Sequence, residues 1–338
     1  MPTTPTEFPG LPAPRELTPY QRPSLRRSLL QLADSVLPYL ALWALMIWSL
    51  RISPWLTLAL TVPTAGFLVR TFIIFHDCGH GSFFRAKWAN EVVGFITGVL
   101  TLTPAHDWWR QHAKHHATAG NLDRRGDGDV WTLTVEEWRQ APRWKRVAYW
   151  CMRQPLFMLT VGPILMFVVL GRFPSRGARR REVLSVLGTN LALVVIVGTL
   201  ILTLGWRHYL LIHVPVTLLS GAMGIWLFYV QHQFVGVYWQ RRGDWNPQVA
   251  AVAGSSYFRL PRILQWFSGN IGFHHVHHLS ARIPNYYLER CHRDHPVLQK
   301  APTLGLAESV RCFRFRLWDE GRQRLVGFRE VRRPQGLA

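Results

Sequence analysis

Three histidine clusters in this 338-residue chain have the spacing of metal ligands on helices. Within each cluster the histidines lie three or four residues apart, and the clusters are His76 and His80; His112, His115 and His116; and His274, His277 and His278. Residues at this spacing share one face of a helix, so their imidazoles can bind a common ion. His275 adds a further imidazole to the third cluster, which reads GFHHVHHLS.

Chance is a sufficient explanation for one such pair, because surface histidines are common. Three clusters, each beside an apolar segment, instead favour a shared metal site. His232, in FYVQHQF at the end of an apolar run, is a ninth candidate ligand; the alternative is a histidine that only hydrogen-bonds between helices. The remaining histidines lack the spacing and are interpreted as ordinary: His106, His208, His213, His292 and His295.

Long apolar runs must position these clusters. A bilayer core needs about 20 helical residues, and four runs are long enough to cross it: 29–50, 54–75, 183–204 and 209–230. The runs 92–105 and 156–170 are shorter, and Gly162 and Pro163 interrupt the second. We therefore expect these two segments to be only partly inserted.

The net charge of +20 would suggest a nucleic-acid partner in a soluble protein, but its distribution gives a different explanation. If the four long runs cross, 36 of the 39 Lys and Arg residues lie in 1–28, 76–182 and 231–338. Arg51 and Arg207 lie in the outer links, and Arg70 in the second run. This is the positive-inside pattern, and it requires no nucleic acid.

The fold expected is thus an all-α integral membrane protein with four transmembrane helices and two partly inserted segments. Residues 1–28 are expected to be a flexible cytoplasmic tail, ahead of a single membrane domain, 29–338. Within that domain, 76–182 and 231–338 form a helical cytoplasmic cap that holds the histidine-rich site.

The order of the histidine motifs resembles that of the membrane fatty acid desaturase family, and in particular the bacterial acyl-lipid desaturases. The resemblance runs from about residue 30 to the end and includes HDCGHGSFF, GIWLFYVQHQF and LQWFSGNIGFHHVHHLSARIPNYYLE. It implies a non-haem di-iron centre, with two Fe ions held by the eight clustered histidines and by His232.

Two features depart from that pattern. Structurally known relatives carry an asparagine one turn before the histidine of the last span, where this chain has Phe228; Asn270 is a candidate substitute. His275 is interpreted as a neighbour of the ligands. Metal-bound imidazoles commonly donate their second N–H to an acceptor, and the candidate partners, which could equally be turn or cap residues, are Asp77, Asp107, Asn121, Asp127, Asp129 and Asn270.

The function implied is O2-dependent desaturation of a long acyl chain, esterified in a membrane lipid of the bacterial inner membrane. A separate electron donor, ferredoxin or flavodoxin, is expected on the basic face, since the chain lacks the His-Pro-Gly-Gly motif of a fused haem domain. A hydroxylase or ketolase of the same superfamily is the nearest alternative. A histidine-rich metal transporter is another, but it would need polar residues along its spans, whose cores contain almost none.

Overall fold

The computed structural model describes residues 8–126 and 128–332. Helices dominate this part of the chain, and the long ones are α2 (Leu25–Ser49), α4 (Thr61–Gly79), α5 (Lys87–Leu100), α6 (Ala105–Thr118), α10 (Arg180–Leu204) and α11 (Trp206–His232). The shorter α-helices are α1 (Pro14–Leu17), α3 (Pro54–Ala59), α7 (Val135–Gln140), α8 (Arg143–Met152), α9 (Pro155–Pro163), α12 (Pro247–Ala253), α13 (Arg262–Phe267), α14 (His274–Leu279), α15 (Asn285–Asp294), α16 (Leu306–Cys312) and α17 (Phe328–Arg332).

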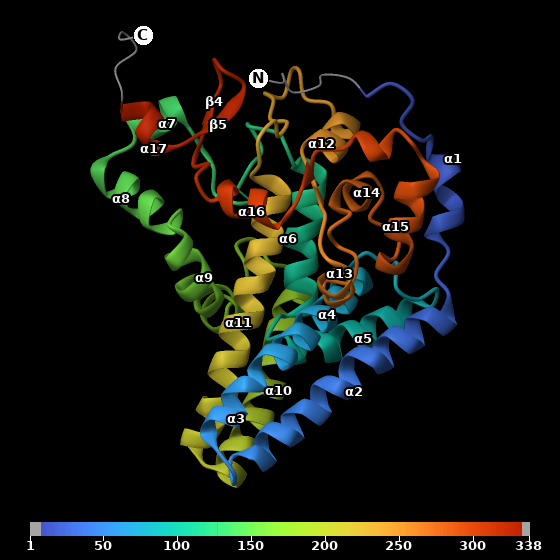
Figure 1. Cartoon of the computed structure of the whole chain (residues 1–338), viewed down its shortest axis with the longest axis vertical. Helices are drawn as coiled ribbons and strands as arrows, with labels where there is room; N and C mark the ends of the chain where they lie inside the picture. The colour runs from blue at the N-terminus through green and yellow to red at the C-terminus, as the bar shows by residue number, and fades with distance from the viewer. Residues whose placement is uncertain (1–7, 127, 333–338) are drawn as a thin grey trace.

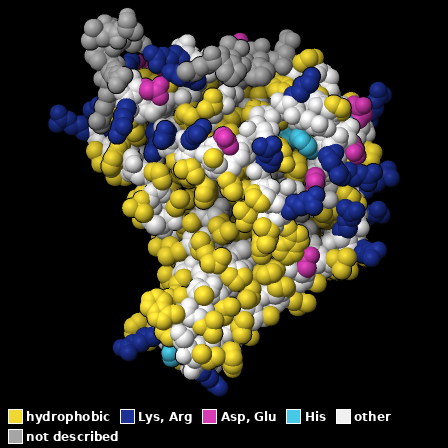
Figure 2. All heavy atoms as spheres, viewed as in Figure 1, with side chains coloured by type: hydrophobic (Ala, Val, Ile, Leu, Met, Phe, Trp, Pro, Cys, Tyr) yellow, Lys and Arg dark blue, Asp and Glu magenta, His cyan; other side chains and the backbone are white. Residues whose placement is uncertain are grey.

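Five helical segments are long and apolar enough to cross a membrane: Leu25–Ser49, Pro54–Gly79, Pro155–Arg172, Arg180–Leu204 and Trp206–His232. Each of the four expected spans coincides with part of one of them, and only 29–50 extends beyond its segment, by one residue. Figure 1 shows α2, α3, α10 and α11 as a stem, and Figure 2 shows its surface covered by hydrophobic side chains, with most basic side chains gathered at the wider end. The chain is therefore a helical membrane protein with one charged end.

The remaining segment, Pro155–Arg172, contains the run 156–170 that was expected to be partly inserted. Its regular α-helix ends at Pro163 and continues as a π-helical stretch, Ile164–Val169, and a 3-10 turn, Leu170–Arg172. Proline removes a backbone donor and clashes with the preceding turn, which accounts for the change of helix type. Entry and return of this segment on one side of the membrane stays a prediction.

Helix α4 lies at the centre of the bundle, in contact with α2, α5, α6, α11 and α13. Most of its residues are buried, whereas α10 exposes a row of large apolar side chains that includes Leu187, Leu191 and Val194. Arg70 of α4 is itself buried and donates to Asp34 of α2 and to the carbonyl of Trp266. The ion pair with Asp34 satisfies a charged group inside an apolar bundle, and the hydrogen bond to Trp266 ties α13 to the centre.

The wide end of the molecule contains α7, α12 and α14–α17 (Figure 1). Two small sheets join its distant segments: β1 (Leu133–Thr134), β4 (Leu317–Asp319) and β5 (Arg324–Val326) form one, and β2 (Tyr257–Phe258) pairs with β3 (Thr303–Leu304) in the other. The wide end therefore draws on both segments expected to form a cap.

Part of the segment expected to be a flexible tail is packed on this end. The helix α1 and the 3-10 turn Thr18–Gln21 precede α2, and Leu17 is buried beside α15. The Tyr20 hydroxyl donates to Asp294 at 2.7 Å, and the Gln21 amide donates to Ser280 at 3.0 Å.

Candidate metal centre

The first histidine pair lies where α4 leaves the bundle. His76 is in the last turn of the helix and His80 is its C-cap, after which Gly81 turns the chain with a φ of 63°. Their ring centroids are 4.8 Å apart, as expected for two rings one turn apart on the same face. The central helix thus delivers two imidazoles directly to its own end.

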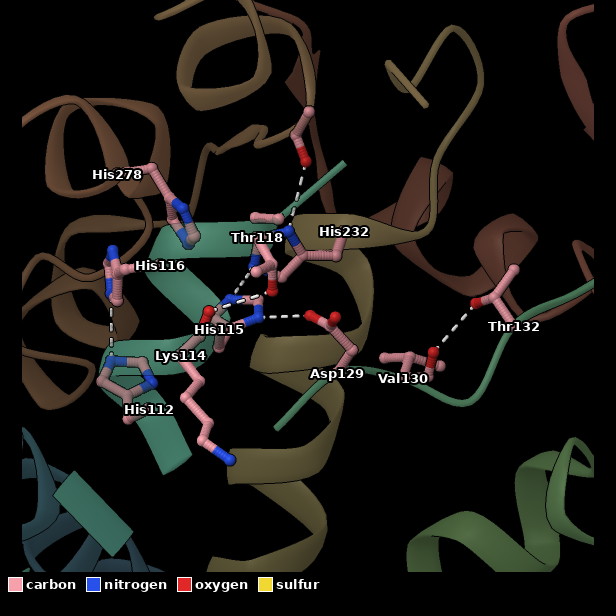
Figure 3. Close-up of polar contacts among 12 residues, drawn as sticks. His112, Lys114, His115, His116, Thr118, Asp129, Val130, Thr132, His232 and His278 are labelled. Atoms are coloured by element: carbon pink, nitrogen blue, oxygen red, sulfur yellow. Dashed lines mark hydrogen bonds and ion pairs between the residues drawn. The ribbon is translucent and has the colours of Figure 1, made fainter. Parts of the chain in front are cut away.

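Helix α6 presents three histidines on two faces. Successive residues of an α-helix are rotated by about 100°, so residues i and i+4 nearly coincide around the axis while i+3 lies on the other side of i. His112 and His116 therefore point together, and their Nε2 atoms are 3.1 Å apart. His115 points elsewhere, toward α11 (Figure 3).

Helix α14 also presents three histidines on two faces, but here the first and third point together and the second points elsewhere. A turn at Gly269 and Asn270, both with positive φ, reverses the chain just before this helix. His274 and His278 then form the coinciding pair, with Nε2 atoms 3.1 Å apart, and His277 faces the other way. The reversal brings α14 against the ends of α4, α6 and α11.

All nine sequence-predicted ligands meet in two groups of ring nitrogens, each within 4.8 Å of one another. We call them the five-histidine group (His76, His80, His112, His116 and His277) and the four-histidine group (His115, His232, His274 and His278). Helices α6 and α14 contribute to both groups, α4 to the first alone, and α11 to the second alone.

The nitrogens point at one another in a way that hydrogen bonds cannot satisfy. His232 Nε2 lies 3.1 Å from His115 Nε2 and 2.9 Å from His274 Nε2, and His277 Nε2 lies 3.0 Å from His116 Nε2. A neutral imidazole has one N–H and one lone pair, so three rings converging through the same atom cannot all be paired. Converging lone pairs form the donor set of a cation.

Acceptors on the far side of several rings determine which nitrogen carries the proton. His76 Nδ1 lies 3.0 Å from Asp77 Oδ1, and His115 Nδ1 bonds to Asp129 (Figure 3). His232 Nδ1 lies 3.2 Å from the carbonyl of Gly254. A carboxylate or carbonyl can only accept, so each of these rings holds its proton on Nδ1 and directs the Nε2 lone pair into its group.

The site is largely buried, and His80, His116 and His278 are its partly exposed members. Burial is the main cause that lowers the pKa of six imidazoles well below the usual histidine value, with the neighbouring rings adding to it: His80, His112, His116, His274, His277 and His278. These rings are therefore neutral at physiological pH, which is the form that binds metal ions.

Some of the candidate hydrogen-bond partners of the imidazoles contact ligand histidines and others do not. Asp77 and Asp129 contact ligand histidines, whereas Asp107 accepts from Ser175 and Asn121 accepts from the backbone of Asp123. The side chain of Asn270, the candidate substitute ligand, accepts a hydrogen bond from Gln265 at 3.0 Å. Asp107, Asn121 and Asn270 thus have hydrogen-bond partners other than the ligand histidines, as turn or cap residues would. Asp127 lies outside the described residues.

Two neighbours of the centre have roles that spacing alone could not assign. His275 points away from both groups, and its Nε2 lies 3.0 Å from Nδ1 of His292, a residue interpreted as ordinary. Phe228 places its ring 5.3 Å from the rings of both His115 and His232. An aromatic ring thus lies beside the smaller group, one turn before His232.

Aromatic side chains also close the larger group. Trp108, expected either at the membrane interface or along an acyl channel, stacks on His112 with ring centroids 4.5 Å apart. It packs edge-on against Phe72 as well. The amide of Asn285 donates to Asp77 at 2.8 Å, which ties the start of α15 to the partner of His76.

Comparison with known proteins gives a consistent result. The model of the fatty acid desaturase family matches residues 53–308. The chain is 47% identical to a fatty acid desaturase of Bacillus subtilis over 94% of its own length and 90% of that protein. It is 29% identical to the sn-1 oleoyl-lipid 12-desaturase of Synechocystis, over 71% of this chain and 68% of the relative. An sn-1 acyl-lipid omega-3 desaturase (ferredoxin) of Nostoc is 28% identical, over 64% of this chain and 61% of the relative.

Proposed function

The chain belongs to the fatty acid desaturase family, and from that premise we propose that it introduces a double bond into an acyl chain esterified in a membrane lipid. The observation that carries the enzymatic role is the convergence of nine imidazoles in two adjacent groups at the end of a membrane bundle. Two relatives whose names specify acyl lipids support the choice of substrate form.

We propose iron as the metal in both groups. The donor set fits, because neutral imidazoles suit redox-active iron, whereas zinc would bind but could not change valence. The chemistry that two iron ions supply when bound is the activation of O2 that allows hydrogen to be removed from an unactivated methylene group.

The chain's own residues hold the site in a state ready for metal. Asp77 and Asp129 keep protons on Nδ1 of His76 and His115, so that the Nε2 atoms face inward as ligands. Trp108 and Phe228 pack against the two groups and keep water from their apolar sides. These contacts leave the imidazoles little freedom to turn away.

Desaturation also consumes two electrons, for which we propose a separate acidic donor protein. The basic side chains around the wide end suit a ferredoxin or flavodoxin, and one relative's name includes ferredoxin. Loss of two hydrogens distinguishes this reaction from hydroxylation, which adds one oxygen.

Expression in a host without desaturases tests the function. Mass spectrometry of derivatised fatty acids should find a product two hydrogens lighter than the saturated chain, and would also locate the bond. Accumulation of a hydroxylated chain alone would contradict the proposal.

We further propose that the protein is in the bacterial inner membrane with the histidine groups on the cytoplasmic side. Reporter fusions at residues 20, 130, 178 and 320 should then read cytoplasmic, and fusions at 52 or 206 periplasmic. A periplasmic signal at 178 would make Pro155–Arg172 a complete span and would contradict the four-span topology.

A further inference from the structure

A cavity of about 850 Å³ opens beside the five-histidine group. Its wall includes His80, Gly79 and Trp109, so the cavity reaches a candidate ligand of the metal site. The volume falls within the range of small-molecule sites. Its lining comes from six parts of the chain: residues 21–23, the end of α4, the start of α5, the start of α6, the start of α10, and the loop before α15.

Cationic side chains surround this cavity, and they are Arg22, Arg85, Lys87, Arg110, Arg181 and Arg282. The two carboxylates in the wall are already engaged. Glu91 pairs with Arg181 at 2.6 Å and with His106 at 3.0 Å, while Glu182 accepts from the backbone N–H of Arg179 at 2.6 Å.

Three of the cations remain free to bind a ligand. In the described part of the chain, the side chains of Arg22, Lys87 and Arg282 have no hydrogen-bond or ion-pair partner. All three are exposed at the mouth of the cavity. The cavity therefore attracts an anion, and with its acids engaged it offers no free carboxylate to a choline or ethanolamine ammonium group.

The mouth lies at the level where lipid headgroups would begin. Lys87 starts α5, whose outer face then exposes Trp88, Val92 and Ile96 at 71%, 50% and 51%. Arg181 is at the start of α10, where Leu184 is 56% exposed. Cations followed immediately by lipid-facing apolar side chains are typical of the headgroup boundary of a bilayer.

We propose that this cavity binds the anionic phosphodiester headgroup of the phospholipid whose acyl chain is desaturated. The inference rests on the proposed function and names the headgroup class of its substrate. Lys87 and Arg282 neutralise the phosphate, and the shared wall at His80 places the bound lipid next to the five-histidine group. A protein donor would instead require a broad contact surface, of about 800 Å² on each partner, whereas this cavity has the volume of a small-molecule site.

Binding of short-chain lipids tests the proposal without turnover. Calorimetry on the purified full-length protein in detergent should show dihexanoyl phosphatidylglycerol binding about tenfold tighter than dihexanoyl phosphatidylcholine. The affinity of the double variant Lys87→Gln/Arg282→Gln for phosphatidylglycerol should be about tenfold lower than that of the parent, because two charged hydrogen-bond donors are removed. Lys87→Arg should retain binding, and so should the control Arg311→Gln, an exposed residue of α16 that does not line the cavity.

Turnover in nanodiscs gives the second measurement. The double variant should raise the KM for phosphatidylglycerol about tenfold and leave kcat and the metal content near those of the parent. Unchanged lipid binding, or an equal loss for phosphatidylcholine, would overturn the proposal. Inorganic phosphate binding as tightly as the lipid would reduce the cavity to a phosphate site and overturn it as well.

A raised KM for the electron donor, with unchanged lipid binding, would assign the cavity to the donor and also overturn the proposal. These outcomes are separate from a failure of the proposed function. If the parent enzyme desaturates lipids of every headgroup with the same KM, the headgroup inference fails and the proposed desaturase function is unaffected. If it desaturates no acyl lipid, the proposed function fails whatever the binding measurements give.

Discussion

The two histidine groups are built from the same kinds of parts but are not equivalent. The five-histidine group receives both imidazoles of α4 and borders the open cavity through His80. The four-histidine group receives a single imidazole from α11, His232, and has the ring of Phe228 beside it. The smaller group therefore has fewer protein donors, and each of them matters more to metal retention.

Two helices, α6 and α14, divide their histidines between the groups. In α6 the coinciding pair of histidines belongs to the larger group and the third histidine to the smaller; in α14 the division is reversed. These two helices thus contribute three imidazoles to each group. The difference between the groups comes entirely from α4, which adds two, and α11, which adds one.

The largest effect should come from His232→Ala. Removing one of four donors should abolish product and lower the metal content of the folded protein by about half, because the smaller group would lose its ion. Metal analysis of the monodisperse fraction measures this. The matching change in the larger group, His277→Ala, should also abolish product but retain more metal, since four donors remain there.

Controls for this experiment lie at the other end of the same helix. His208→Ala and His213→Ala, in the first turns of α11, should leave metal and product unchanged. Normal metal per folded molecule in His232→Ala, with reduced thermal stability alone, would show that His232 is only a structural residue.

A smaller effect is expected when the carboxylate partners are changed. Asp129→Asn should lower activity about 10- to 100-fold through weaker orientation of His115, with little change in Tm. Asp77→Asn should lower activity similarly and Tm as well, because Asp77 also accepts from the backbone and side chain of Asn285. Equal Tm losses in the two variants would show that the partners do not differ in structural role.

Phe228→Asn would make the groups more alike. A carboxamide one turn before His232 adds an oxygen donor to the smaller group, so metal should be lost to a chelator more slowly, by roughly a few fold. Phe228→Leu serves as the control, because it removes the ring without adding a donor. Faster loss in the asparagine variant than in the leucine variant would contradict this view of the smaller group.

The smallest effect on the metal should come from His275→Ala. This residue bonds to His292 rather than to either group, so the metal content should stay normal. Loss of a buried hydrogen bond should cost about 1–3 kcal/mol of stability and reduce activity only partly. His292→Ala should reproduce the stability loss, and a fall in metal content in either variant would place the pair within the site.

The ligand residues could be predicted from the sequence because spacing reports directly on helical faces. The division of His112, His115 and His116 between two groups follows from the same geometry, once the helix is known to lie between both. The sequence named Asp77 and Asp129 only among several candidate partners of the rings. Asp129 approaches His115 through an irregular loop, whereas Asp107, an equally good candidate, bonds to Ser175 instead. Choosing between them requires the tertiary path of the chain.

The membrane segments were predictable from length and apolarity, whereas the packing of the N-terminal segment was not. Residues 14–24 are polar and proline-containing, and contacts with distant segments, among them those of Leu17, Tyr20 and Gln21, hold them in place. The place of Asn270 in a turn, with a φ of 57°, was likewise not predicted from the sequence.

The position of α14 also determines when the centre can form during synthesis. His274, His277 and His278 follow the last membrane helix, and six of the nine candidate ligands precede them in the chain. Every span must therefore have been synthesised before either group is complete. A chain truncated before α14 would keep four of the five donors of the larger group but only two of the four donors of the smaller group, so the smaller group would stay without its metal however well the helices had entered the bilayer.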